Sequence, residues 1–218
     1  MTKQRRDFEL NRPGAVIAAL PAVLGFVPEK SLVLLSIDGG ELGSVMRVDL
    51  SDALAEQIAH LAEVAAAASP EAAIAVIVDE DGAGCPMCNE QYRDLCSTLT
   101  GELSRHDIAL WAAHVVDRVA AGGRWHCVDG CGAGGVVDDP GASPLAVAAV
   151  LDGRRLYGRR EELARVVAPT DTAASDALAE VIAGYADAEV DLASAIEEAM
   201  TAAARAATGR ELSEAVMA

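Results

Sequence analysis

The sequence predicts an α/β protein with a mixed, largely parallel sheet flanked by helices. The continuous apolar run at 72–78 is typical of a strand buried on both faces. Helical periodicity follows over 89–103, and a second apolar run follows at 108–116, so the three segments predict a βαβ unit. With 218 residues, 52% of them hydrophobic, the chain can bury this sheet in a single core.

The N-terminal elements are predicted from prolines, glycines and strand-like runs. Two short helices at 13–20 and 21–24 each begin with proline, which the first helical turn tolerates, and Gly25 ends the second. The runs 32–37 and 41–50 are joined by an Asp-Gly-Gly turn. Together they predict an N-terminal β-hairpin.

The remaining elements follow in order. Ser51 is a suitable N-cap for a helix that ends near Pro70. After the βαβ unit, 124–128 reads as a short strand that leads into 129–135, which is too rich in glycine for a helix. Two further helices are expected at 143–151 and 160–167.

The chain is expected to divide near residue 169. Residues 1–169 would form the α/β domain with its cysteine-rich loops, and 170–218 a helical C-terminal segment that packs on this domain or on a partner. The alanine- and glutamate-rich segment has the apolar spacing of amphipathic helices. A homodimer through these C-terminal helices is one possible arrangement.

Charge and composition exclude several functions. The chain is acidic, with a formal net charge of −17, and would repel nucleic acid. It has neither a secretory signal nor the run of roughly 20 apolar residues that a membrane span needs. We therefore expect a cytoplasmic protein without nucleic-acid or membrane partners, in which thiols stay reduced.

Four of the five cysteines form two close pairs, Cys85/Cys88 and Cys127/Cys131, each in a glycine-rich turn after a strand-like run. Structural zinc takes four thiolates or imidazoles, and these spacings let each loop supply two. We expect one structural zinc per chain, held by Cys85, Cys88, Cys127 and Cys131. His126 could replace a thiolate, but on a strand it alternates away from Cys127. Iron or an iron-sulfur cluster would use the same ligands.

The leading interpretation is a non-catalytic binding or regulatory module with an unknown protein partner, because no catalytic set accompanies the metal spacing. One alternative is a dithiol oxidoreductase using Cys85 and Cys88 at a helix N-terminus, where the thiol pKa falls. Another is a zinc-dependent hydrolase at the carboxyl edge of the sheet, where Asp79, His114 and Asp117 could form an acid/base group.

Several segments resemble a known family. They are LPAVLGFVPEKSLV at 20–33, RVDL at 47–50, WHC at 125–127, SP at 143–144, GR at 153–154, REEL at 160–163 and Pro169. Over residues 10–170 the chain resembles an actinobacterial family known as domain of unknown function 4192 (DUF4192). The resemblance implies an α/β fold and no established activity. The Cys85/Cys88 pair is not a general feature of that family, so a site that uses it would belong to a subgroup.

Overall fold

The computed structural model describes residues 10–51, 53–168 and 172–185. The chain divides into two compact units, Met1–Val167 and Ala168–Ala218. The predicted division into 1–169 and 170–218 stays a prediction. The expected C-terminal helical segment is described only through α6 (Thr172–Tyr185), and its later part lies outside the described residues.

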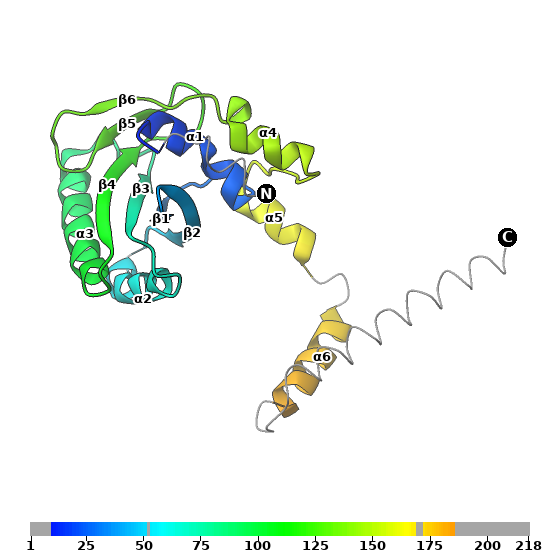
Figure 1. Cartoon of the computed structure of the whole chain (residues 1–218). Coiled ribbons are helices and arrows are strands. Elements are labelled where there is room, and N and C mark those ends of the chain that lie inside the picture. Colours follow the sequence, from blue (N-terminus) through cyan, green and yellow to red (C-terminus); the bar gives the residue numbers. More distant parts are fainter. Residues whose placement is uncertain (1–9, 52, 169–171, 186–218) are drawn as a thin grey trace. The chain divides into compact units, whose positions relative to one another are not determined.

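A six-stranded mixed sheet with the order β2-β1-β3-β4-β5-β6 forms the centre of the first unit (Figure 1). The expected α/β fold and N-terminal hairpin are confirmed, and Gly39 and Gly40 both adopt positive φ angles in the hairpin turn, as a tight two-residue turn requires. The strands are β1 (Ser31–Asp38), β2 (Glu41–Asp49), β3 (Ala72–Val78), β4 (Ala109–Val116), β5 (Arg124–Cys127) and β6 (Gly134–Val136).

The sheet is less parallel than the sequence predicts. Among the described strands only β3 and β4 pair in parallel, and all other neighbours are antiparallel. The chain crosses from β3 through α3 to the neighbouring parallel strand β4 and then returns from β4 into β5 and from β5 into β6 through short loops, which can join only antiparallel strands. A largely parallel sheet is therefore wrong, although the mixed sheet and the predicted crossover are correct.

Helices cover both faces of the sheet in the first unit (Figure 1). Residues of α2 and α3 form one core with alternate residues of β1, β3 and β4. Residues of α1 form the other core with the intervening residues of the same strands. The helices are α1 (Pro13–Leu24), α2 (Leu54–Ala66), α3 (Pro86–Ser104), α4 (Pro144–Leu151) and α5 (Arg160–Val167), with a short 3-10 turn η2 (Pro140–Ala142) before α4.

Two local predictions in the helices need correction. The two expected N-terminal helices are one, α1, which continues through Pro21 because its residues are buried against the sheet; Gly25 ends it with a φ of 85° as expected. Ser51 is not the side-chain cap of α2, whose N-cap residue is Ala53. Instead the backbone carbonyl of Ser51 accepts from Leu54 N at 2.9 Å.

Candidate functional site

Cys85 occupies the N-cap position of α3, directly after the turn that follows β3. Its backbone N–H closes this turn on Gly82 O at 3.0 Å. Pro86 stands at the first helical position, where a missing N–H costs no helical hydrogen bond. The Cys85 Sγ accepts a hydrogen bond from the Cys88 N–H at 3.3 Å. The turn therefore delivers one thiol to the positive end of a 19-residue helix.

The two thiols of this pair differ in acidity. Hydrogen bonds from the Cys88 thiol and then from the Cys88 N–H lower the pKa of Cys85. The same thiol–thiol hydrogen bond is the largest cause that raises the pKa of Cys88. Because the thiolate is the nucleophilic form of cysteine, Cys85 is the better nucleophile, while Cys88 keeps its proton and donates the hydrogen bond between the two sulfurs.

Asn89 ties this turn to β5. Its Nδ2 donates to Ala83 O at 3.1 Å and to Cys85 O at 2.9 Å, so its Oδ1 is left as the acceptor. That oxygen lies 2.7 Å from His126 Nε2. His126 must therefore carry its proton on Nε2, and its Nδ1 remains an acceptor when the ring is neutral. Sequence reasoning missed Asn89, whose place four residues after Cys85 was the available signal.

A hydrogen bond between Asp79 and Tyr92 stabilises the same turn. The Tyr92 hydroxyl donates to Asp79 Oδ2 at 2.6 Å. Burial, followed by this hydrogen bond, raises the pKa of Tyr92, so the hydroxyl keeps its proton and stays a donor. Gly82 lies against this pair, where a Cβ would overlap the Tyr92 hydroxyl. The turn before Cys85 is thus held by the side chains of Asp79, directly after β3, and Tyr92 on α3.

The second pair, Cys127 and Cys131, lies at the end of β5 and in the loop that follows. Burial, as the largest cause, and a side-chain hydrogen bond with Cys131 raise the pKa of Cys127. Gly130 and Gly132 have φ angles of 67° and 83°, so the loop turns back on itself between the strands. Because its pKa is raised, Cys127 is a poorer nucleophile than Cys85. Cys96 is buried on α3 as expected, and burial raises its pKa to about 12.

The structure keeps the two cysteine pairs at different positions. The loop after Cys127 binds the middle of α3, where Arg93 Nε donates to Val128 O at 3.3 Å. Arg93 follows Cys85 by eight residues, or about 12 Å along a helix. Strand alternation also places Cys127, which is opposite His114 in the ladder, on the other face from His126.

No three Cys, His, Asp or Glu side chains of the described residues come together as a metal site. Zinc at Cys85, Cys88, Cys127 and Cys131 would require the loop after β5 to move toward the N-terminus of α3, because Zn–S bonds are only about 2.3 Å long. The four-cysteine zinc site therefore stays a prediction, to which this geometry adds no support.

The predicted acid/base residues each have a different environment. Asp79 accepts from Tyr92. Asp117 accepts from the backbone N–H groups of Arg118 and Arg124 at 2.6 and 2.8 Å, so it stabilises the β4–β5 turn. His114 is buried with its ring edge-on to Trp125 at 5.1 Å, and burial lowers its pKa. These contacts favour structural roles for all three residues.

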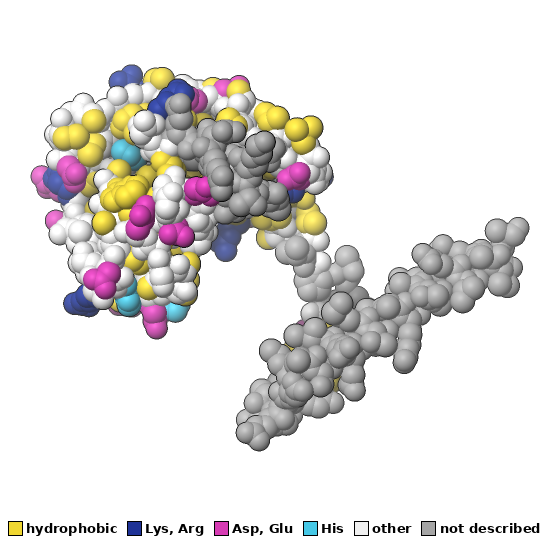
Figure 2. Space-filling view, viewed as in Figure 1, with side chains coloured by type: hydrophobic (Ala, Val, Ile, Leu, Met, Phe, Trp, Pro, Cys, Tyr) yellow, Lys and Arg dark blue, Asp and Glu magenta, His cyan; other side chains and the backbone are white. Residues whose placement is uncertain are grey.

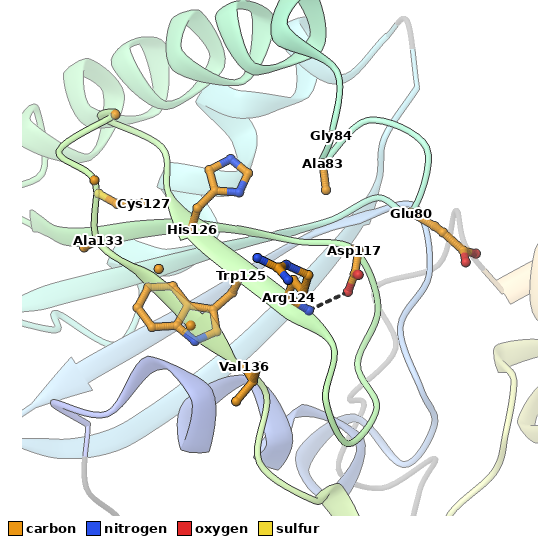
Figure 3. A pocket seen from close by; sticks show the side chains of 14 residues that line it. Glu80, Ala83, Gly84, Asp117, Arg124, Trp125, His126, Cys127, Ala133 and Val136 are labelled. Carbon is orange, nitrogen blue, oxygen red and sulfur yellow. Dashed lines mark hydrogen bonds between the residues drawn. The ribbon is translucent and has the colours of Figure 1, made fainter.

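A cavity of about 750 Å³ lies beside the first cysteine pair. Ala83 and Gly84, the residues just before Cys85, form one wall, and residues of β5, β6 and the loop between them, Cys127 included, form most of the rest (Figure 3). Glu80 and Asp117 complete the lining. Arg124 and His126 both line it; as alternate residues of β5 they project from the same side of the strand. The cavity lies beyond the carboxyl ends of β3 and β4, where α/β sheets often bind ligands.

Comparison with protein families gives a match to one model, Domain of unknown function (DUF4192), over residues 13–218. The chain belongs to the DUF4192 family. No curated protein and no solved structure matches it. An actinobacterial origin stays a prediction.

Membership of DUF4192 extends the expected resemblance toward residue 218 but assigns no reaction. No helix in the described ranges combines the length and apolar character needed to cross a membrane. Acidic side chains are spread across the face shown in Figure 2, in keeping with the net charge of −17. For this DUF4192 chain, functional inference therefore depends on the chemistry of its own residues.

Proposed function

We propose that this protein is a dithiol oxidoreductase in which Cys85 is the attacking thiol and Cys88 the resolving thiol. The observation that carries the proposal is the position of Cys85 at the N-cap of α3, with its Sγ accepting the Cys88 N–H. A helix N-terminus and a donated hydrogen bond both stabilise a thiolate. The lowered pKa of Cys85 and the raised pKa of Cys88 agree with this division of roles.

The reaction would proceed by two thiol–disulfide exchanges. The Cys85 thiolate attacks one sulfur of a substrate disulfide, forming a mixed disulfide and releasing the other half as a thiolate. Cys88 then loses its proton and attacks the Cys85 sulfur, which closes the Cys85–Cys88 disulfide and releases the second half. Two electrons pass to the substrate, whose two thiolates take up the protons given by the two cysteines.

The surroundings of the pair support access by a substrate. Cys85 and Cys88 are both partly exposed. Met87, between them, is 70% exposed, so it offers an apolar contact surface beside the reacting sulfurs. Residues three apart at a helix start also have Cβ atoms about 5–6 Å apart, which a modest adjustment brings within disulfide range.

The deciding experiment measures reduction of 2-hydroxyethyl disulfide by the reduced protein, with thiol release as the readout. We expect Cys85→Ser to abolish thiol release in this single round of exchange and Cys88→Ser to stop the reaction at a mixed disulfide detectable by mass spectrometry. Cys96→Ser and Cys131→Ser are the matched controls and should retain wild-type rates. Equal rates for Cys85→Ser and Cys131→Ser would overturn the proposal.

A four-cysteine structural zinc site in a non-catalytic binding or regulatory module is the second candidate, favoured by the spacing within each pair. It predicts that replacing any one of the four cysteines lowers the stability of the protein, because loss of any ligand opens a metal site. Elemental analysis of protein purified without chelator would support it at one zinc per chain, with Cys85→Ser and Cys127→Ser lowering Tm equally. A zinc-dependent hydrolase would further need an open coordination position.

The proposed setting is the cytoplasm, where a reduced dithiol persists, and the proposed assembly is a homodimer through the C-terminal helices. Within α6 the side chains of Leu178, Val181 and Ile182 are exposed at spacings of three and four residues. Such a stripe lies on one helical face and suits a second helix. Light scattering of the full chain and of Val181→Glu tests the dimer, and equal masses at the monomer value would contradict it.

A further inference from the structure

The cavity next to the turn before Cys85 has the position of a substrate pocket for the proposed reaction, on which this inference rests. Cys127 is the cysteine among its lining residues, and Cys85 follows directly after the lining residue Gly84. Ala83 and Gly84 line it and lead directly to Cys85. A Cβ built on Gly84 meets no atom within 4 Å, so the wall next to the dithiol is open. At about 750 Å³ the cavity has the size of small-molecule sites and not of an interface with a folded protein.

Arg124 is the one basic side chain among the described residues that line the cavity, which also include the acidic residues Glu80 and Asp117. No ion pair among the described residues neutralises its guanidinium, since Asp117 pairs with Arg118 at 3.1 Å. Glu80 also lines the cavity, but its side chain points away from Arg124 in Figure 3. In a chain with a net charge of −17, an unpaired guanidinium beside a thiol site is an unusual feature. It fits a ligand that brings its own negative charge.

His126 supplies the second polar group of the cavity. Its Nε2–H is committed to Asn89, so its Nδ1 is the group left to accept a hydrogen bond. Burial lowers the pKa of His126, which keeps the ring neutral near pH 7. Arg124 and His126, two residues apart on β5, thus offer one cationic donor and one neutral acceptor on the same side of the strand.

We propose that the cavity binds one half of a small disulfide that carries a carboxylate, with the carboxylate on Arg124 and a donor group of the ligand on His126. The disulfide sulfur then lies toward Gly84 and the Cys85 thiolate. Exchange proceeds as described above: Cys85 bonds to one sulfur, and the other half leaves as a thiolate. Arg124 is a specificity residue here, since it contacts the bound ligand and takes no part in bond exchange.

The test compares three disulfides of similar size and different charge: 3,3′-dithiodipropionate, 2-hydroxyethyl disulfide and cystamine. We expect Arg124→Gln to lower the ratio of the second-order rate constants for thiol release from the anionic over the neutral disulfide by about fivefold, as for one partly exposed ion pair. Arg105→Gln removes the same charge from an exposed position at the far end of α3 and should change this ratio by less than twofold.

The outcomes separate this inference from the proposed function. If wild-type protein reduces the neutral disulfide but Arg124→Gln and Arg105→Gln have the same charge preference, the dithiol function stands and the carboxylate pocket is wrong. If no disulfide is reduced, both are wrong. The effect of Arg124→Gln should shrink between 0.01 and 1 M salt, because the Debye length falls from about 30 to 3 Å.

Discussion

The two cysteine pairs of this protein have similar spacing in the sequence, but their surroundings shift the pKa of the first thiol in opposite directions. Cys85 stands at a helix N-terminus and receives hydrogen bonds, which lower its pKa. Cys127 stands at the end of a strand, and its burial raises its pKa. The comparison shows that thiol reactivity follows from what the backbone presents to the sulfur, because the two pairs have nearly the same sequence spacing.

The largest expected difference between the pairs is in alkylation rate. At pH 7 we expect Cys85 to react with iodoacetamide faster than Cys127, since the lowered pKa of Cys85 gives it the larger fraction of thiolate. Site-resolved mass spectrometry over a time course measures both rates in one sample of native protein. Faster reaction at Cys127 would contradict the assignment of Cys85 as the more reactive thiol.

The second prediction concerns the turn that presents Cys85. Gly82→Ala should lower the free energy of unfolding by about 2 kcal/mol, because the new Cβ displaces the Tyr92 hydroxyl from Asp79. Gly84→Ala, two residues on, meets no neighbour and should change it by no more than about 0.5 kcal/mol. Urea denaturation of both variants supplies the values. Equal losses would mean that the contact between Asp79 and Tyr92 does not hold this turn.

The third prediction, with the smallest expected effect, concerns His114, which lies opposite Cys127 in the sheet. His114 is buried and its pKa is lowered, so between that pKa and about 6.5 the unfolded chain binds more protons than the folded one. The contribution of neutral His114 to the free energy of unfolding is therefore fully present above about pH 6.5. It is lost as the pH falls from there through the pKa of His114 in the folded protein. His114→Phe removes this group, so the free energy of unfolding should fall less between pH 7.5 and 5 than it does in the wild type.

The control for this third prediction is His60→Gln, since His60 is exposed on α2. Urea denaturation at the two pH values should show an unchanged pH dependence for that variant. The same pH dependence in His114→Phe as in the wild type would assign the acid sensitivity to other groups. His126, whose pKa is also lowered, is the first of these to test.

Sequence patterns predicted the hairpin, β3, α3 and β4, because turn glycines and long apolar runs are local signals. They also placed Cys85 at a helix start. They did not predict where the loop after Cys127 binds along α3, since the hydrogen bond from Arg93 to Val128 joins residues 35 apart. Asn89 was missed for a related reason: its three hydrogen bonds depend on Ala83 and His126 lying nearby, and an isolated amide has no motif.

The brevity of β5 has a consequence for the sheet as a whole. Among the described residues of β4, β5 pairs only with His114, Val115 and Val116, so the first half of β4 has no strand partner on that side. The β3–β4 register shifts between Ala73 and Ile74, opposite the stretch where Trp111 stands 56% exposed. An edge of this kind is a template for an added strand. This stretch is therefore an additional place, besides the outer edges of β2 and β6, where partial unfolding would allow another strand to pair.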